Sequence, residues 1–214
     1  SGAYISYFNL AKSGFEDPMT THSDHYESNY GYSSAAYSKG EVFLEQLGYI
    51  VGADVRDKIL LEYYKQWRFK HPNATDFMRV AEQVSGIQLD WYKEYWVNTT
   101  KTIDYRIDSL WEESGITKIR LRRTGKLPMP VDLQLTFKDG STEMFYVPLN
   151  LMFGNKPNEN LAQKRELLEE WRWTHPAYVV ETKHKLTDIK IVEIDPSKRM
   201  ADVDRKNNKL ELNW

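Results

Sequence analysis

Hydrophobic residues in the first hundred positions recur every three or four residues, the spacing of helices that bury one face. Val42, Phe43 and Leu47 begin the clearest of these patterns, which loosens at Gly48 and Gly52. Three further segments repeat the spacing, so four helices joined by short loops are expected, near 40–52, 54–70, 75–86 and from 89 onward. The polar residues before them predict the N-caps, which are Ser33 or Ser34, Asp54 and Thr75.

The period of the hydrophobic pattern changes after Thr99, from helical spacing to an alternation of apolar and polar residues. Residues 131–137 alternate strictly, and the sequence KDGS that follows at 138–141 is typical of a hairpin turn. Six segments of this kind predict strands, at 102–110, 116–123, 130–137, 142–149, 177–183 and 186–194. Roughly seven short strands with turns between them favour an antiparallel β-sandwich.

These two patterns predict an α+β fold in two domains, with a boundary near residue 100. The first domain, 1–100, is expected to be helical, and the second, 101–214, to be an Ig-like antiparallel β-sandwich. A charged stretch at 156–173 interrupts the second domain, and we expect it to be a helical or loop insertion on the surface.

The composition limits the classes of partner. The 29 basic and 31 acidic residues give a net charge of −2, so the chain has no general attraction for nucleic acid or anionic membranes. Nucleic acid is therefore not an expected partner. No apolar run approaches the length of a membrane span, so no membrane span is expected either. The absence of cysteine excludes disulfides, thiolate metal ligands and a cysteine nucleophile within these 214 residues.

Two segments combine residue types that bind metal ions, with His22, Asp24, His25 and Glu27 in one and Asp202, Asp204 and Asn208 in the other. The spacing in the first suits neither a helical pair of ligands nor a known loop site, and the second lacks the glycine of a calcium-binding loop. We therefore expect both to be polar loops and assign no metal ligand. The sequence also has no Gly-rich phosphate loop, no G-x-S-x-G nucleophile elbow and no zinc-binding H-E-x-x-H.

Two tyrosines, Tyr32 and Tyr37, mark the run YSSAAYSKGEVFLEQLG at 32–48. A tyrosine near the start of a helix is usually a packing residue. This run, however, resembles the segment that carries the catalytic tyrosine in the gluzincins, the alanyl-aminopeptidase and leukotriene-hydrolase family of zinc metallopeptidases. The sequence TDFMRVAEQVSGIQLDWYKEYWVN at 75–98 looks like a helical signature of the same family, so the resemblance covers about residues 15–100.

The resemblance implies that residues 1–100 are the helical C-terminal part of a thermolysin-like catalytic domain, and that the sandwich is similar to the third domain of bacterial members. In that family, zinc is bound by H-E-x-x-H and by a glutamate on the next helix, and neither motif is in this chain. The chain would then be a fragment of a longer aminopeptidase and inactive alone. Its partners would be the missing N-terminal part of the same protein and a peptide substrate. Because many bacterial members are exported, the resemblance favours a periplasmic or exported location.

By the same resemblance, Tyr37 is the catalytic residue that donates a hydrogen bond to the oxyanion formed when metal-activated water attacks the first peptide bond. Tyr32 is expected to line the substrate-binding pocket. Zinc is the cofactor implied for the full-length parent, and none is expected in this chain. The alternative is a non-catalytic interaction module, in which the helices and the sandwich bind a partner through Trp and Tyr anchors.

Overall fold

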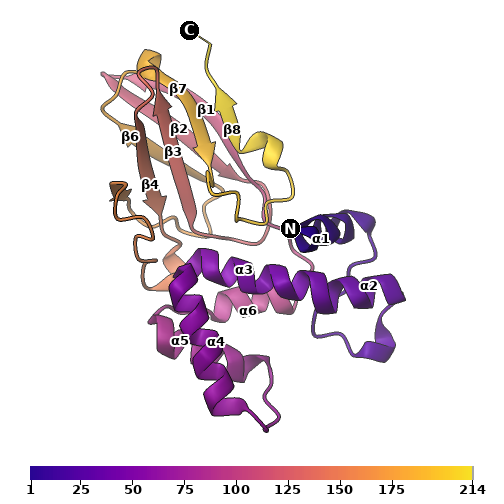
Figure 1. The fold of residues 1–214 in the computed structure, drawn as a ribbon. Helices are drawn as coiled ribbons and strands as arrows, with labels where there is room; N and C mark the ends of the chain where they lie inside the picture. The colour runs from indigo at the N-terminus through magenta and orange to yellow at the C-terminus, as the bar shows by residue number, and fades with distance from the viewer. Residues whose placement is uncertain (214) are drawn as a thin grey trace. The chain divides into compact units, whose positions relative to one another are not determined.

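Helices and strands occupy separate parts of the chain in the computed structural model, which describes residues 1–213 (Figure 1). One compact part, here called the helical unit, contains Ser1–Thr102 together with Leu151–Glu159. The other, here called the strand unit, contains Ile103–Asn150 and residues 160–213. Since the helices and the strands are segregated along the chain, the protein is of the α+β class, as the sequence predicts.

The helical unit contains the four helices that the hydrophobic spacing predicts and two more that it does not single out. The described helices are α1 (Gly2–Ser13), α2 (Asn29–Ser33), α3 (Gly40–Val51), α4 (Ala53–Trp67), α5 (Ala74–Ser85) and α6 (Asp90–Val97). A π-helical segment, Ser34–Lys39, joins α2 to α3 without a break. Helices α1 and α2 were not predicted, because α1 has almost no apolar periodicity and α2 is only five residues long.

The expected N-cap before α3 is wrong, because the helix begins earlier than the apolar pattern does. Ser33 and Ser34 both have helical backbone angles and lie inside the continuous helix. The cap is Ser28, whose extended backbone and Oγ, which accepts from the Gly31 amide at 3.0 Å, start α2. The small residues at 33–36 therefore continue the helix and do not begin it.

The expected caps of α4 and α5 are also wrong, each by two positions. Asp54 is the second residue of α4, and the Ala53 amide donates instead to the Glu159 carboxylate at 2.9 Å. Thr75 lies within α5, whose cap is Asn73 in a reciprocal capping box with Asp76. This cap of α4 could not be predicted from the neighbouring sequence, because the acceptor of the Ala53 amide is Glu159, which is 106 residues away.

Aromatic side chains of α3 and α6 form the centre of the helical unit. Phe43 and Tyr92 stack with ring centroids 5.0 Å apart, and the Tyr92 hydroxyl donates to the Phe43 carbonyl at 2.6 Å. Trp96 is fully buried against Tyr7 of α1 at 5.3 Å. The aromatic residues of α6 are therefore core residues and do not form an open ligand platform.

Leu151–Glu159 belongs to the helical unit although strands precede and follow it in the sequence. The Met152 carbonyl accepts from the Gln88 amide at 2.8 Å, and the buried Lys156 ammonium lies 4.5 Å from the centre of the Tyr49 ring. The stretch 156–173 is therefore not one insertion. Its first four residues belong to the helical unit, and the rest has no helix and includes the short strand β5 (Arg165–Leu167).

The strand unit contains two sheets, in the orders β1-β2-β6 and β5-β4-β3-β7-β8. All the strand pairs in the described residues are antiparallel except β4–β5. The other bounds are β1 (Tyr105–Glu113), β2 (Ile116–Arg123), β3 (Val131–Phe137), β4 (Thr142–Val147), β6 (Ala177–Thr182), β7 (Ile189–Ile194) and β8 (Lys209–Glu211).

All six strands that the alternation predicts are present, and β3 follows it most closely, with every second side chain buried from Val131 to Phe137. Strands β5 and β8 were not expected. Each has three residues and no alternating burial, so neither gives a recognisable period in the sequence.

We expect Glu159→Ala to lower the free energy of unfolding of the helical unit by about 1 kcal/mol, because the first amide of α4 loses its acceptor. Urea unfolding followed by the helical circular dichroism signal measures the change. Glu170→Ala, at an exposed position of the strand unit, is the control. Equal stability of the two variants would contradict a capping role for Glu159.

Candidate functional site

Tyr37 lies in the π-helical segment between α2 and α3 and points away from the core of the helical unit. Its side chain is 73% exposed, whereas Ser34, Ala35 and Lys39 of the same segment are buried. π-Helical turns are rare and occur frequently at functional sites. The exposed phenol and its unusual backbone make this segment the candidate site.

Tyr32 and Tyr37 are both exposed, and the backbone changes from α-helical to π-helical between them. A π-turn, whose hydrogen bonds join residues five apart, is wider than a regular turn of α-helix. In this part of the chain the residues at 32, 33, 36 and 37 are exposed, whereas those at 34, 35 and 39 are buried.

Tyr32 is 40% exposed and is supported by the loop that connects α1 to α2. Its ring meets Tyr26 edge to face with centroids 5.4 Å apart, and the Tyr26 hydroxyl donates to the Pro18 carbonyl at 3.2 Å. The loop also touches α2 at Gly31, where a Cβ would lie 2.8 Å from the Phe15 carbonyl oxygen. Glycine is therefore needed at position 31 for this close approach.

Lys39 lies two residues after Tyr37, and its side chain is only 1% exposed. The ammonium forms an ion pair with Glu16 at 2.7 Å, where the Glu16 side chain is 6% exposed, and it donates to the Thr99 carbonyl at 3.2 Å. Trp96 covers it at 5.8 Å from the ring centre. Burial lowers the pKa of Lys39, and the Glu16 carboxylate opposes this shift.

Neither Glu16 nor Lys39 was expected from the sequence to belong to the site. Glu16 is 23 residues from Lys39 and lies in a loop, so no helical or strand spacing connects them. The one sequence signal is the charge of Lys39 itself, which occupies a position that the helical period assigns to the buried face.

The segment with His22, Asp24, His25 and Glu27 forms a polar turn. His22 caps the 3₁₀ helix Ser23–His25, with its Nδ1 accepting from the Asp24 amide at 3.3 Å. Within residues 1–213, no three His, Asp or Glu side chains come together in a way that could hold a metal ion.

The second of these segments uses its carboxylates to bind backbone. Asp202 accepts from the Tyr105 amide at 2.8 Å and from the Asn208 side chain at 2.9 Å, which connects this loop to the start of β1. Asp204 donates its amide to the same carboxylate at 2.9 Å. Asp202 and Asn208 are buried, so their role is structural, and burial raises the pKa of Asp202.

Asp195, just before this loop, is a second buried carboxylate. It accepts from the Ser197 hydroxyl at 2.5 Å and from the Met200 amide at 2.8 Å. Burial raises its pKa from 3.8 to about 6, although these hydrogen bonds act in the opposite direction.

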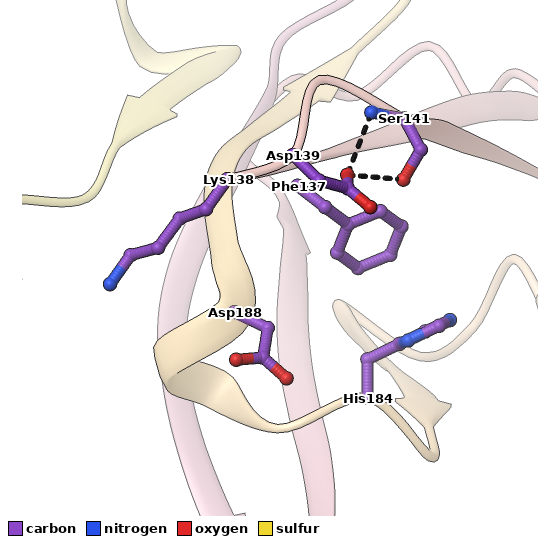
Figure 2. Close-up of a pocket in the computed structure, with 6 residues that line it drawn as sticks. All are labelled: Phe137, Lys138, Asp139, Ser141, His184 and Asp188. Carbon is purple, nitrogen blue, oxygen red and sulfur yellow. Dashed lines mark hydrogen bonds between the residues drawn. The ribbon is translucent and has the colours of Figure 1, made fainter.

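Figure 2 shows a pocket of about 310 Å³ in the strand unit, beside the turn between β3 and β4. It combines Asp139, Ser141 and His184, residue types found in hydrolase triads. The Ser141 hydroxyl, however, donates to Asp139 at 2.6 Å, and His184 lies against Glu143 at 3.2 Å and the Phe137 ring at 4.3 Å. Because the serine donates to the carboxylate, the arrangement is a turn and does not form a triad.

A second pocket, of about 370 Å³, lies within the helical unit. Its lining is mainly apolar and includes Phe43, Tyr63, Phe77 and Val97. Neither of these two pockets is lined by Tyr32 or Tyr37, and both tyrosines of the candidate site are exposed.

No protein family model matches the chain, and no curated protein sequence matches it either. No helix in residues 1–213 is both long enough and apolar enough to cross a bilayer. The assignment of a function therefore depends on the tyrosine segment and its surroundings.

We expect Lys39→Met to lower the free energy of unfolding by about 3–5 kcal/mol, because it leaves Glu16 buried without its counter-ion. The double variant Glu16→Met/Lys39→Met should recover much of this loss, since no buried charge remains. Urea unfolding measures both. Lys65→Met, which removes an exposed ion pair with Glu62, is the control and should cost less than about 1 kcal/mol. Similar losses for Lys39→Met and Lys65→Met would contradict the account.

The raised pKa of Asp195 predicts a pH dependence of stability. Between about pH 4 and pH 6 the folded protein keeps a proton that the unfolded chain has lost. The contribution of Asp195 is therefore complete below about pH 4 and is lost as the pH rises through about 6. From pH 4 to pH 7, the unfolding free energy of the wild type should fall by about 3 kcal/mol relative to Asp195→Asn. A difference that does not change with pH would contradict the shift.

Proposed function

We propose that this chain is the C-terminal part of a zinc-dependent aminopeptidase of the gluzincin family, and that Tyr37 is its oxyanion-stabilising residue. The observation that carries the proposal is the Tyr37 phenol, 73% exposed on a π-helical turn whose neighbouring Lys39 is buried and paired. The resemblance of residues 32–48 and 75–98 to that family supplies the reaction.

The proposed role of Tyr37 needs a donor that is rigidly held and aimed outward. When a nucleophile attacks the carbonyl of a peptide bond, negative charge develops on the carbonyl oxygen, and a fixed O–H donor stabilises that charge. Two features of Tyr37 support this role: residues beside it in the π-helical segment are buried, and its side chain is exposed and available to a substrate. Tyr32, which is also exposed, would contact the peptide substrate.

The metal chemistry would come from outside this chain. The described residues 1–213 offer no cluster of ligands that fits zinc, so no residue of this chain is assigned to the metal. In the full-length parent, zinc bound by H-E-x-x-H and a further glutamate would supply the activated water. The chain's own contribution is the donor Tyr37 and the wall of the substrate site around Tyr32.

The finer fold assignment follows from the same proposal. The helical unit would be the end of a thermolysin-like catalytic domain, and the strand unit would be an Ig-like β-sandwich. The two sheets of the strand unit and the alternating burial of β3 support the second assignment.

Exposed aromatic side chains in this part of the helical unit support a partner at this site. Phe15, Tyr30, Tyr32 and Tyr37 are all exposed, from the start of the loop after α1 to the π-helical turn. Aromatic residues are enriched at protein interfaces relative to the rest of the surface. The missing N-terminal part of the same protein and a peptide substrate are the partners proposed here, in a periplasmic or exported setting.

The same exposed aromatic residues favour a second candidate function, a non-catalytic interaction module. Tyrosine is enriched at the energetic centres of protein interfaces, so the exposed tyrosines could serve as anchors without any chemistry. The two functions differ in what Tyr37 must provide. A binding anchor uses the ring, whereas an oxyanion donor uses the hydroxyl.

In the full-length parent, Tyr37→Phe should lower kcat and kcat/KM together by roughly a hundredfold or more with little change in KM, because the lost hydrogen bond exists only in the transition state. Tyr32→Phe is the matched control and should lose much less. Steady-state kinetics on an aminoacyl reporter, with the zinc content checked in each variant, measures these effects. The 214-residue chain alone should bind no stoichiometric zinc and cleave no reporter. A near-normal kcat for Tyr37→Phe would favour the interaction module.

A further inference from the structure

We propose that Glu16 and Lys39 are positioning residues for Tyr37: their buried ion pair fixes the π-helical turn and thereby the direction of the phenol. This inference rests on the proposed function, because it assigns the pair a part in the same reaction. It adds two residues, one of them outside the run that resembles the gluzincin segment, to the single catalytic residue assigned above.

The ion pair connects the π-helical turn to two other parts of the helical unit. Glu16 belongs to the loop after α1, and Thr99 follows the end of α6. The Lys39 ammonium, at 2.7 Å from Glu16 and 3.2 Å from the Thr99 carbonyl, binds both at once. An ammonium has three donors on a flexible stem, so it can hold two separate acceptors from one helical turn.

A π-helical turn needs support from outside the helix. The wide turn is rarely adopted by an isolated segment, and it persists where tertiary contacts favour it. Lys39 is the last residue of the π-helical segment and Tyr37 is only two residues before it. The contacts that hold the backbone at Lys39 therefore also restrict the direction of the Tyr37 side chain.

A buried charged pair is energetically less favourable at this position than an apolar pair would be. Burying both charges costs desolvation energy that an apolar pair would avoid, so the ion pair adds little stability of its own. The ion pair instead restricts the direction of the π-helical turn, because an ion pair with hydrogen bonds allows a narrower range of geometries than apolar contacts do. The burial of Tyr7 and Trp96 beside it keeps water from competing with these bonds.

The double variant Glu16→Met/Lys39→Met separates direction from stability. It removes the pair but keeps apolar volume, so the variant should fold and approach wild-type stability. Amide hydrogen exchange on the 214-residue chain should nevertheless become faster by about tenfold or more at residues 34–40. Tyr92→Phe is the control, since it removes a buried hydrogen bond of the same unit away from the turn. Equal exchange at 34–40 in the double variant and in Tyr92→Phe would overturn the proposal.

A kinetic cycle in the full-length parent tests whether the effect passes through Tyr37. The double variant should lower kcat by about tenfold to a hundredfold with KM nearly unchanged, because a misdirected donor fails only in the transition state. In a Tyr37→Phe background the same double variant should change kcat by less than about twofold. If the ion pair contributed only to stability, the double variant would lower kcat by the same factor in both backgrounds, or it would keep the wild-type kcat because its stability recovers. Either result would overturn the positioning role.

The two proposals fail differently in this cycle. If Tyr37→Phe alone keeps a near-normal kcat, the catalytic assignment is wrong and the positioning role falls with it. If Tyr37→Phe is impaired and the double variant is additive with it, the catalytic assignment stands and only the positioning role is overturned.

Discussion

The ion pair between Lys39 and Glu16 is the interaction on which the candidate site depends. It lies in the interior of the helical unit, where a charge without a partner would be strongly unfavourable, so the two residues must remain together whenever the unit is folded. Through it, the loop after α1 and the end of α6 are held against the same helical turn. The exposed Tyr37 is fixed because the residue two positions further on is not free to move.

In the strand unit, buried charged side chains likewise hold irregular backbone in place. Asp202 and Asp195 are buried carboxylates whose hydrogen bonds go mainly to main-chain amides of the loop at 195–208 and to Tyr105. Such carboxylates satisfy amides that no strand pairing can reach. In both units, then, charged groups that could suggest metal or acid–base chemistry instead fix the course of the chain. The Tyr37 phenol differs from these groups in being exposed.

Repeating patterns made a large part of the fold predictable. Helix α3 and strand β3 bury one face over several turns or residues, so their periods are clear in the sequence. Strands β5 and β8 are too short to show a period, and α2 is recognisable only from its cap, Ser28. The return of Leu151–Glu159 to the helical unit was not predictable, because it depends on contacts between residues that are distant in sequence.

The same distinction applies to the candidate site. Tyr32 and Tyr37 were identified from a local run, and the structure adds that both are exposed, but the π-helical turn that carries Tyr37 gives no local signal. Glu16 could not be predicted, since only the folded unit brings it to Lys39.

The central claim is that this chain is part of a longer zinc aminopeptidase to which it contributes Tyr37. The most direct test is peptide-mapping mass spectrometry of the native protein, which reads the polypeptide that contains this sequence. The account predicts peptides before Ser1 that include an H-E-x-x-H motif and, on the following helix, a glutamate ligand. A native polypeptide without that motif would contradict the account and leave the interaction module as the better explanation.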